Sequence, residues 1–250
     1  MTEIQSLARG LRILEMLAES DDGRGITDLA NEMGIDKGSV SRLLQTLAHY
    51  GFADKDLDTK RYHLGPMVVS LSRSLLVKMP LRETAKPYLH KLVDLTGECA
   101  HLGVYAQERI LYVDQEESPF TLRVNAEVGS TAPLHCTALG KAVLAFGGAP
   151  FPKTLSLHTT RTIIDPDLLH YNLELTKKQG YAIDDEEFDY GVRCIAAPVH
   201  DFRGKTIGAI GISGPAARIT LEKIPEIAKS VMEVARELTE KMSFKKKSRH

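Results

Sequence analysis

Apolar residues recur at helical spacing through the first fifty residues of the chain. Over residues 7–19, leucines return every three or four positions, which predicts an amphipathic helix with one apolar face. A turn-rich loop separates it from a short helix over 26–33, and Gly34 is a suitable stop signal. Asp36 is a suitable N-cap for a third helix that ends at Gly51. The leucines expected to face inward on the first helix are Leu7, Leu11, Leu14 and Leu17.

After the third helix the pattern changes to short alternating segments, which are typical of strands. Two of them, over 52–56 and 60–64, flank a polar turn and predict a β-hairpin. Pro66 then opens an apolar helix over 66–78, because proline is favoured in the first helical turn. This helix stops before Pro80 and predicts a connection between two domains.

Beyond residue 80, strand patterns and helical patterns are mixed, which predicts an α+β domain. A helix over 81–95 opens it, a looser helical stretch runs to about residue 179, and a long helix over 221–242 closes it. The predicted strands span 99–106, 109–115, 120–128, 191–199 and 205–213, with a short helix over 137–146.

The outward face of the third helix carries short hydroxyls, an amide and one arginine. A solvated helix would more often carry Glu and Lys pairs there. In a DNA major groove, Arg pairs with guanine and Gln with adenine. Two helices joined by a tight glycine-containing turn form a helix-turn-helix, and the hairpin after it would be a wing that contacts phosphates. The predicted DNA-binding residues are Lys37, Gly38, Ser39, Ser41, Arg42, Gln45, Lys60 and Arg61.

Charge leaves an ordinary solvated helical domain open as the alternative. The whole chain has a net charge of −1, and residues 1–65 contain eight Lys and Arg against eleven Asp and Glu. The basic residues nevertheless cluster on the third helix and the hairpin. The start of the chain does not resemble a secretory signal, no apolar run is long enough to cross a membrane, and the three cysteines lack metal spacing. A cytoplasmic, reducing location is expected.

Six blocks in order make the chain similar to IclR-type transcriptional regulators. They are LARGLRILEMLA, ITDLANEMGIDKGSVSRLLQTLAHYGF, YHLG, VGSTAPLHCTALGKAVLAF, GYAIDDEEFDYGVRCIAAPV and GAIGISGPAARIT. The resemblance implies a winged helix-turn-helix at 1–65, a linker helix at 66–80 and a GAF-like effector-binding and oligomerisation domain at 81–243, leaving a basic tail at 244–250 that we expect to be disordered. It also implies homodimers or dimers of dimers on near-palindromic operators of catabolic genes, as repressors or activators.

The resemblance carries DNA contacts to Lys37, Ser39, Ser41 and Arg42, while Gly38 departs from the serine common at its position. It also implies an effector pocket. Gly211 departs from a serine found in relatives that bind small keto acids, which would remove a hydroxyl and make room for a larger ligand. The implied pocket residues are Ala138, Leu139, Asp184, Cys194, Gly211 and Ser213.

An organic carboxylate, with an aromatic acid as one candidate, is the expected effector. The start of the helix over 137–146 would favour an anion through its free N–H groups and its dipole. Arg123 and His135 would add positive or switchable charge nearby. We expect no cofactor.

Two other functions are compatible with some of the residues of this chain: an enzyme and a metal- or redox-responsive sensor. An enzyme could use Cys194 or Cys136 as a nucleophile. The chain has no nucleophile elbow and no G-x-G-x-x-G motif, so we expect no enzymatic activity. A metal- or redox-responsive DNA-binding sensor remains the alternative function. Its side chains would be Cys99, His101, His135, Cys136 and Cys194, each of which could equally be a packing residue.

Overall fold

The computed structural model describes residues 3–244 and divides into two compact units, Met1–Lys78 and Met79–His250. We call them the N-terminal unit and the C-terminal unit. The helix predicted to link two domains belongs to the N-terminal unit. The basic tail predicted at 244–250 lies outside the described residues from 245 onward. No helix in the described part of the chain is long and apolar enough to span a membrane.

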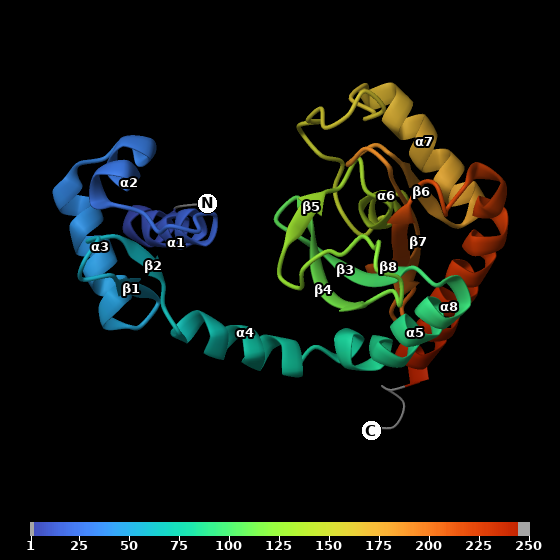
Figure 1. The fold of residues 1–250 in the computed structure, drawn as a ribbon, viewed down its shortest axis with the longest axis horizontal. Helices are drawn as coiled ribbons and strands as arrows, with labels where there is room; N and C mark the ends of the chain where they lie inside the picture. Colours follow the sequence, from blue (N-terminus) through green and yellow to red (C-terminus); the bar gives the residue numbers. More distant parts are fainter. Residues whose placement is uncertain (1–2, 245–250) are drawn as a thin grey trace. The chain divides into compact units, whose positions relative to one another are not determined.

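The N-terminal unit contains three helices, a two-stranded hairpin and a fourth helix (Figure 1). Asp36 caps the third helix, because its carboxylate accepts a hydrogen bond of 2.8 Å from the backbone N–H of Ser39. Gly34 ends the second helix in the left-handed conformation at φ 64°. Both predicted caps are therefore confirmed. The elements are α1 (Gln5–Ala18), α2 (Ile26–Met33), α3 (Lys37–His49), β1 (Ala53–Lys55), β2 (Tyr62–Leu64) and α4 (Met67–Val77).

The apolar face predicted for α1 is only partly correct. Leu17 is buried, but Leu7 and Leu11 are 59% and 54% exposed. Ile13 and Met16 are buried in their place, packed in one cluster with residues of α2, α3 and the hairpin. The side of α1 that faces this small core is therefore rotated from the leucine stripe. The unpacked leucines leave an apolar strip on the surface of the unit.

The C-terminal unit is built on one antiparallel sheet of six strands in the order β5-β4-β3-β8-β7-β6. The long helices α5 and α8 pack in one cluster with residues of the sheet, and α6 packs with α7 in a second cluster (Figure 1). The elements are α5 (Pro80–Thr96), β3 (Cys99–Ala106), β4 (Arg109–Glu116), β5 (Thr131–Pro133), α6 (Ala138–Ala145), α7 (Pro166–Gln179), β6 (Ala182–Asp185), β7 (Val192–His200), β8 (Thr206–Pro215), the 3-10 turn Leu221–Lys223 and α8 (Ile224–Phe244).

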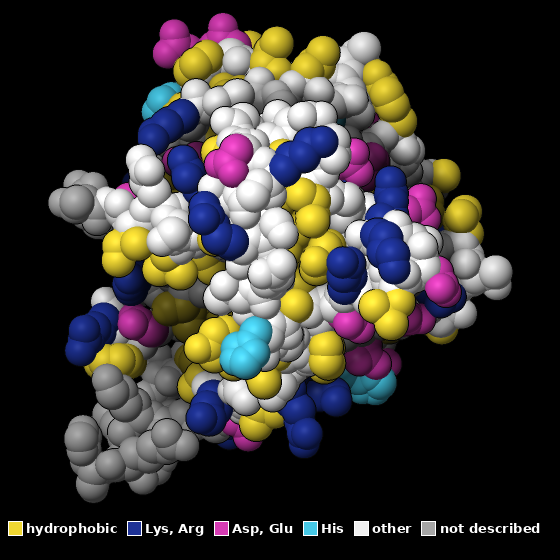
Figure 2. Space-filling view, turned by 90° about the vertical axis from the view of Figure 1, so that its left-hand side faces the viewer, with side chains coloured by type: hydrophobic (Ala, Val, Ile, Leu, Met, Phe, Trp, Pro, Cys, Tyr) yellow, Lys and Arg dark blue, Asp and Glu magenta, His cyan; other side chains and the backbone are white. Residues whose placement is uncertain are grey.

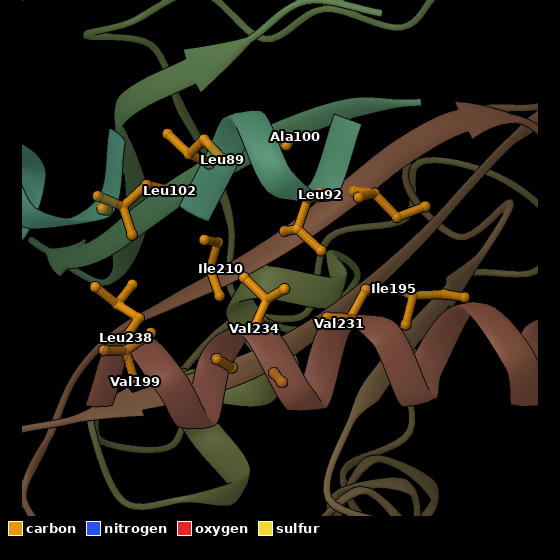
Figure 3. Packing of buried hydrophobic residues seen from close by; sticks show 14 of the residues in the cluster. Leu89, Leu92, Ala100, Leu102, Ile195, Val199, Ile210, Val231, Val234 and Leu238 are labelled. Carbon is orange, nitrogen blue, oxygen red and sulfur yellow. The ribbon is translucent and has the colours of Figure 1, made fainter. Parts of the chain in front are cut away.

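Branched aliphatic side chains fill the space between the sheet and the two long helices (Figure 3). Leu89 and Leu92 of α5 meet Val231, Val234 and Leu238 of α8, and all five are at most 1% exposed. Alternate residues of the central strands point into the same layer. This layer holds the sheet rigid, so that its other face can carry a binding site.

The strand predicted over 120–128 is wrong. Residues 117–130 form an irregular loop, and the short strand β5 follows it at Thr131–Pro133. Phe120 and Leu122 alternate with polar residues as in a strand, but their side chains are 48% and 70% exposed. The strand β6 was not predicted, because its last two residues, Asp184 and Asp185, begin the acidic run 184–189, and acidic residues are uncommon in strands.

Candidate functional sites

The helix α3 presents the predicted DNA-binding residues on its outward side. Val40 and Leu44 are fully buried on the opposite side, which fixes the orientation of the helix. Lys37, Arg42 and Gln45 are exposed, while Ser39 and Ser41 are half-buried. Around Gly38 the space is open, except that the Asp36 carboxylate would lie 3.1 Å from a Cβ at this position. Five side chains and one glycine of α3 therefore line one accessible surface.

Hydrogen bonds along α3 orient its polar side chains. The Arg42 guanidinium donates to Ser39 Oγ at 3.2 Å, and the Gln45 amide donates to Ser41 Oγ at 3.4 Å. These are exposed bonds, so DNA can replace them at low free-energy cost. Arg42 and Gln45 are thereby held as donors at the surface of the helix.

The two predicted wing residues occupy different environments. Lys60 is exposed at a left-handed backbone position, φ 61°, and its ammonium group donates to the carbonyl of Leu57. Arg61 donates to the carbonyl of Gly23 at 2.9 Å and lies 3.7 Å from the Asp28 carboxylate. Arg61 therefore attaches the hairpin to the loop between α1 and α2. Lys and Arg side chains are spread among uncharged and apolar ones on the face shown in Figure 2.

In the C-terminal unit, one cavity of about 290 Å³ lies between the sheet, the start of α6 and the loop 117–130. Such a volume is near the lower end for small-molecule sites. We call it the effector cavity. Six of the eight predicted pocket residues line it, and Arg123 and His135 do not. Those six are Ala138, Leu139, Asp184, Cys194, Gly211 and Ser213.

The two predicted charged residues are engaged elsewhere. Arg123 pairs with Glu117 at 2.9 Å. His135 is 1% exposed, and its imidazole Nε2 lies 3.0 Å from the carbonyl of Ser156. Burial lowers the pKa of His135. Among the described residues that line the cavity there is no Lys or Arg, and the ionisable ones include Glu127, Asp184 and Asp189.

Asp184 is the most deeply placed acid of the cavity. Its carboxylate accepts hydrogen bonds from the backbone N–H of Glu187 at 2.8 Å and of Phe188 at 3.4 Å. Burial, assisted by the neighbouring Glu187, raises the pKa of Asp184 to about 7 against the effect of those bonds and of Lys141. Near neutral pH Asp184 therefore exists partly as a neutral acid that can donate a hydrogen bond.

A buried ion pair lies behind this acid. Lys141 of α6 has a side-chain exposure of 0% and pairs with Glu187, whose exposure is 8%. The second carboxylate oxygen of Glu187 has no hydrogen-bond partner among the described residues. The backbone carbonyl of Glu187 accepts hydrogen bonds from the hydroxyls of Thr159 and Thr162. The pair thus joins α6 to the turn after β6.

The Ser213 hydroxyl is already committed to protein groups. It donates to the carbonyl of Val124 at 2.9 Å and lies 2.6 Å from Nε2 of His101. Burial lowers the pKa of His101 to about 4, so this imidazole is neutral at physiological pH. In this arrangement Nε2–H donates to Ser213, and Ser213 fastens the loop 117–130 to the sheet. Asn125 of the same loop accepts a hydrogen bond from the Cys99 thiol at 3.0 Å.

Gly211 has a structural reason in the packing of the sheet. A Cβ at this position would lie 2.3 Å from the carbonyl oxygen of Ile195 and 2.6 Å from the Cβ of Ala196. The glycine is therefore required by the close approach of β7. The expectation that it makes room for a larger ligand stays a prediction.

The Cys and His residues considered for a sensor do not form a metal site. Among residues 3–244, no three His, Cys, Asp or Glu side chains are grouped in a way that could hold a metal ion. Burial raises the pKa of the thiols of Cys99 and Cys194, and that of Cys136 to about 12. Since the thiolate is the reactive form, these thiols are poor nucleophiles.

Sequence reasoning missed several residues of the effector cavity. Tyr112 of β4 lines it, as do Asn125 of the loop and Phe188 and Asp189 of the turn after β6. The acidic run 184–189 has a composition typical of a solvated turn, yet its Glu187 is buried. Alternation along β4 was a signal that could have suggested Tyr112, but it did not tell which sheet face would carry the cavity.

Comparison with known proteins covers both units. The model of the IclR helix-turn-helix domain matches residues 6–57, and that of the bacterial transcriptional regulator IclR C-terminal domain matches residues 73–240. The chain is 34% identical over 249 residues to the HTH-type transcriptional regulator BhcR of Paracoccus denitrificans, covering 97% of this chain and 89% of the relative. It is 36% identical over 239 residues to the glycerol operon regulatory protein of Streptomyces coelicolor, covering 93% and 94%.

A solved structure with the same fold is the Thermotoga maritima IclR. It superposes with a TM-score of 0.69 at 27% identity, covering 96% of this chain and 99% of that one. The matches therefore run through both units.

Proposed function

Because the chain belongs to the IclR family of DNA-binding transcriptional regulators, we propose that a small organic carboxylate, bound in the effector cavity, controls its affinity for an operator of catabolic genes. The effector cavity carries this proposal. It encloses a volume suited to a small molecule, and the start of α6 borders it at Ala138 and Leu139. The Streptomyces coelicolor relative is named for a glycerol operon, a target of the same general kind.

A carboxylate fits this cavity only if neutral groups hold it. The first N–H groups of α6 are the helix end that attracts an anion, because the Thr137 side chain satisfies only the N–H of Gly140 at 3.2 Å. Asp184 can contribute in its neutral form, as its pKa of about 7 allows. Binding of the anion would then favour the protonated form of Asp184.

Operator recognition is assigned to α3 and the hairpin. Arg42 and Gln45 suit direct contacts with bases, while Lys37 and Lys60 suit contacts with phosphates. A homodimer would place two α3 helices in major grooves about 34–36 Å apart if the half-sites are one helical turn apart. Exposed apolar residues of α1 and α4, including Leu11 and Leu75, support association of two N-terminal units.

Fluorescence anisotropy on DNA from directly upstream of the protein's own gene tests this function. Binding should survive excess nonspecific DNA, and one carboxylic acid of a panel should shift it by roughly 5- to 150-fold, the usual range of coupling between two sites. Arg42→Ala should weaken the specific binding by about 1–3 kcal/mol. Arg203→Ala, which removes an exposed arginine of the C-terminal unit, serves as the matched control.

Three outcomes separate the parts of the proposal. Competitor-resistant binding that no acid shifts would reject the carboxylate class and keep the regulator. An Arg42→Ala protein that binds the operator at wild-type strength would reject the assignment of α3 as the reading helix. Loss of binding in the Arg203→Ala control would show that the assay reports net charge rather than recognition.

A further inference from the structure

One tyrosine hydroxyl at the effector cavity has no hydrogen-bond partner among the described residues. Tyr112 lines the cavity from β4, and its hydroxyl makes no hydrogen bond with any other described residue. The side chain is half-buried rather than fully enclosed, so part of it faces the cavity space. A tyrosine hydroxyl that faces a cavity can donate a hydrogen bond to a ligand bound there.

The ring of Tyr112 is held in place by its neighbours. It meets the neutral imidazole of His101 edge to face, with ring centroids 5.7 Å apart and an interplanar angle of 78°. His101 is itself bonded to Ser213, so both ring positions depend on groups of the rigid sheet. The hydroxyl is thus a preorganised group, and little conformational entropy is lost when it binds.

The surroundings of the hydroxyl keep it a donor. Burial raises the pKa of Tyr112, and the nearby Cys194 and Asp184 act in the same direction. At physiological pH the phenol is therefore protonated and can donate its O–H. Because no Lys or Arg is among the described residues that line the cavity, neutral donors of this kind must supply the polar contacts of an anionic ligand.

We propose that the Tyr112 hydroxyl binds the effector directly, by donating a hydrogen bond to a carboxylate oxygen at the end of the cavity where Asp184 and the start of α6 meet. This inference rests on the proposed function, because it presumes a carboxylate effector. Tyr112 is then a specificity-determining residue: it favours ligands that place an acceptor oxygen at this point.

Calorimetric titration of the full-length protein with acetate, pyruvate, lactate, benzoate and 4-hydroxybenzoate tests the assignment. Tyr112→Phe removes one oxygen atom and keeps the ring against His101. A hydrogen bond to a charged group corresponds to a loss of affinity of about 10- to 150-fold in this variant. Tyr105→Phe is the matched control, because Tyr105 packs against the same apolar cluster but does not line the cavity. Its affinity should stay within about twofold of the wild type.

The outcomes separate this inference from the function on which it rests. If the wild type binds an acid and Tyr112→Phe binds it equally well, the role of Tyr112 is rejected and the effector class stands. If the wild type binds none of the five acids, the carboxylate class fails, and the role of Tyr112 fails with it. If both tyrosine variants lose affinity alike, the loss reflects packing and the assignment is rejected.

A second measurement does not depend on the folding of a variant. The protein contains eight tyrosines, and incorporation of 3-fluorotyrosine gives each a fluorine signal. Saturation with the tightest-binding acid should shift the Tyr112 signal most, because its hydroxyl gains a charged partner. A Tyr112 signal that does not move at saturation would overturn the proposal.

Discussion

Asp184 shows how strongly one buried position determines the chemistry of a site. The same side chain belongs to β6, accepts two backbone hydrogen bonds from the turn and lines the effector cavity. Its exposure of 2% leaves almost no solvent to stabilise a negative charge. As a residue of the effector pocket, Asp184 was suggested by the resemblance to a family. The sequence could not suggest the raised pKa, because that depends on how deeply the folded chain buries the carboxyl group.

Substitution of Asp184 by asparagine should remove a pH dependence. Because the folded pKa of about 7 exceeds the ordinary value of 3.8, Asp184 contributes stability that is fully present below about pH 4 and is lost as the pH rises through 7. Asp184→Asn retains an oxygen acceptor and cannot ionise. Its free energy of unfolding relative to wild type should rise by about 1–3 kcal/mol from pH 5 to pH 8, at 1.36 kcal/mol per pKa unit. Urea denaturation at several pH values measures this, and parallel curves would contradict it.

At the scale of elements, α6 combines structure and binding in eight residues. It lies against the sheet with seven of its eight residues buried, and its first turn borders the effector cavity. Thr137 holds this end of the helix: its hydroxyl donates to the carbonyl of Pro133 at 2.7 Å and accepts from the N–H of Gly140. The orientation of the first N–H groups of α6 therefore depends on one side chain.

Thr137→Val should destabilise the protein and weaken acid binding together. Valine matches threonine in shape but leaves the N–H of Gly140 and the carbonyl of Pro133 without these partners. The expected loss is about 1–2 kcal/mol of unfolding free energy. Thr137→Ser, which keeps the hydroxyl, should lie close to wild type. Thermal unfolding and acid titration of both variants provide the measurement, and equal behaviour of the two would show that the cap is not needed.

The helices were more predictable than the segments that cover the cavity. The predicted helix over 66–78 and the N-cap Asp36 match α4 and α3, since caps and periodicity are local properties. The segment 120–128 alternates as a strand does, but tertiary contacts determine its structure. Val124 and Asn125 bond to the side chains of Ser213 and Cys99. The position of α1 was likewise set by packing, which turned Ile13 inward and left Leu7 outside.

At the scale of the whole molecule, exposed apolar strips on α1 and α4 are the main feature of the described part of the N-terminal unit. None of the residues of α4 is buried, and Val69, Leu71, Leu75 and Val77 are 55–70% exposed. A helix so apolar is rarely stable in water alone. Association of two chains would cover α4, and the same association would bring two α3 helices onto one operator.

Leu75→Glu should therefore weaken both association and operator binding. A charge in an apolar contact between two copies must be buried without a partner, which costs several kcal/mol and shifts the equilibrium toward monomers. Ser70→Glu, about 140° around the helix from Leu75, is the matched control for that position. Sedimentation at several concentrations, together with operator titration, measures both effects. A Leu75→Glu protein that associates as the wild type does would rule out this strip as the contact.

The buried pair of Lys141 and Glu187 has a consequence for how the cavity can change its size. To move α6 away from the turn after β6, the protein would have to separate two opposite charges in its interior. Another part of the cavity wall is the loop 117–130, which Val124 and Asn125 attach to the sheet through neutral hydrogen bonds that are easier to break. The part of the cavity wall formed by α6 and the turn after β6 thus resists displacement, and the part formed by the loop 117–130 is displaced more easily. A ligand larger than about 290 Å³ would enter and be accommodated by displacement of this loop, and the size limit for ligands would be set by residues 117–130.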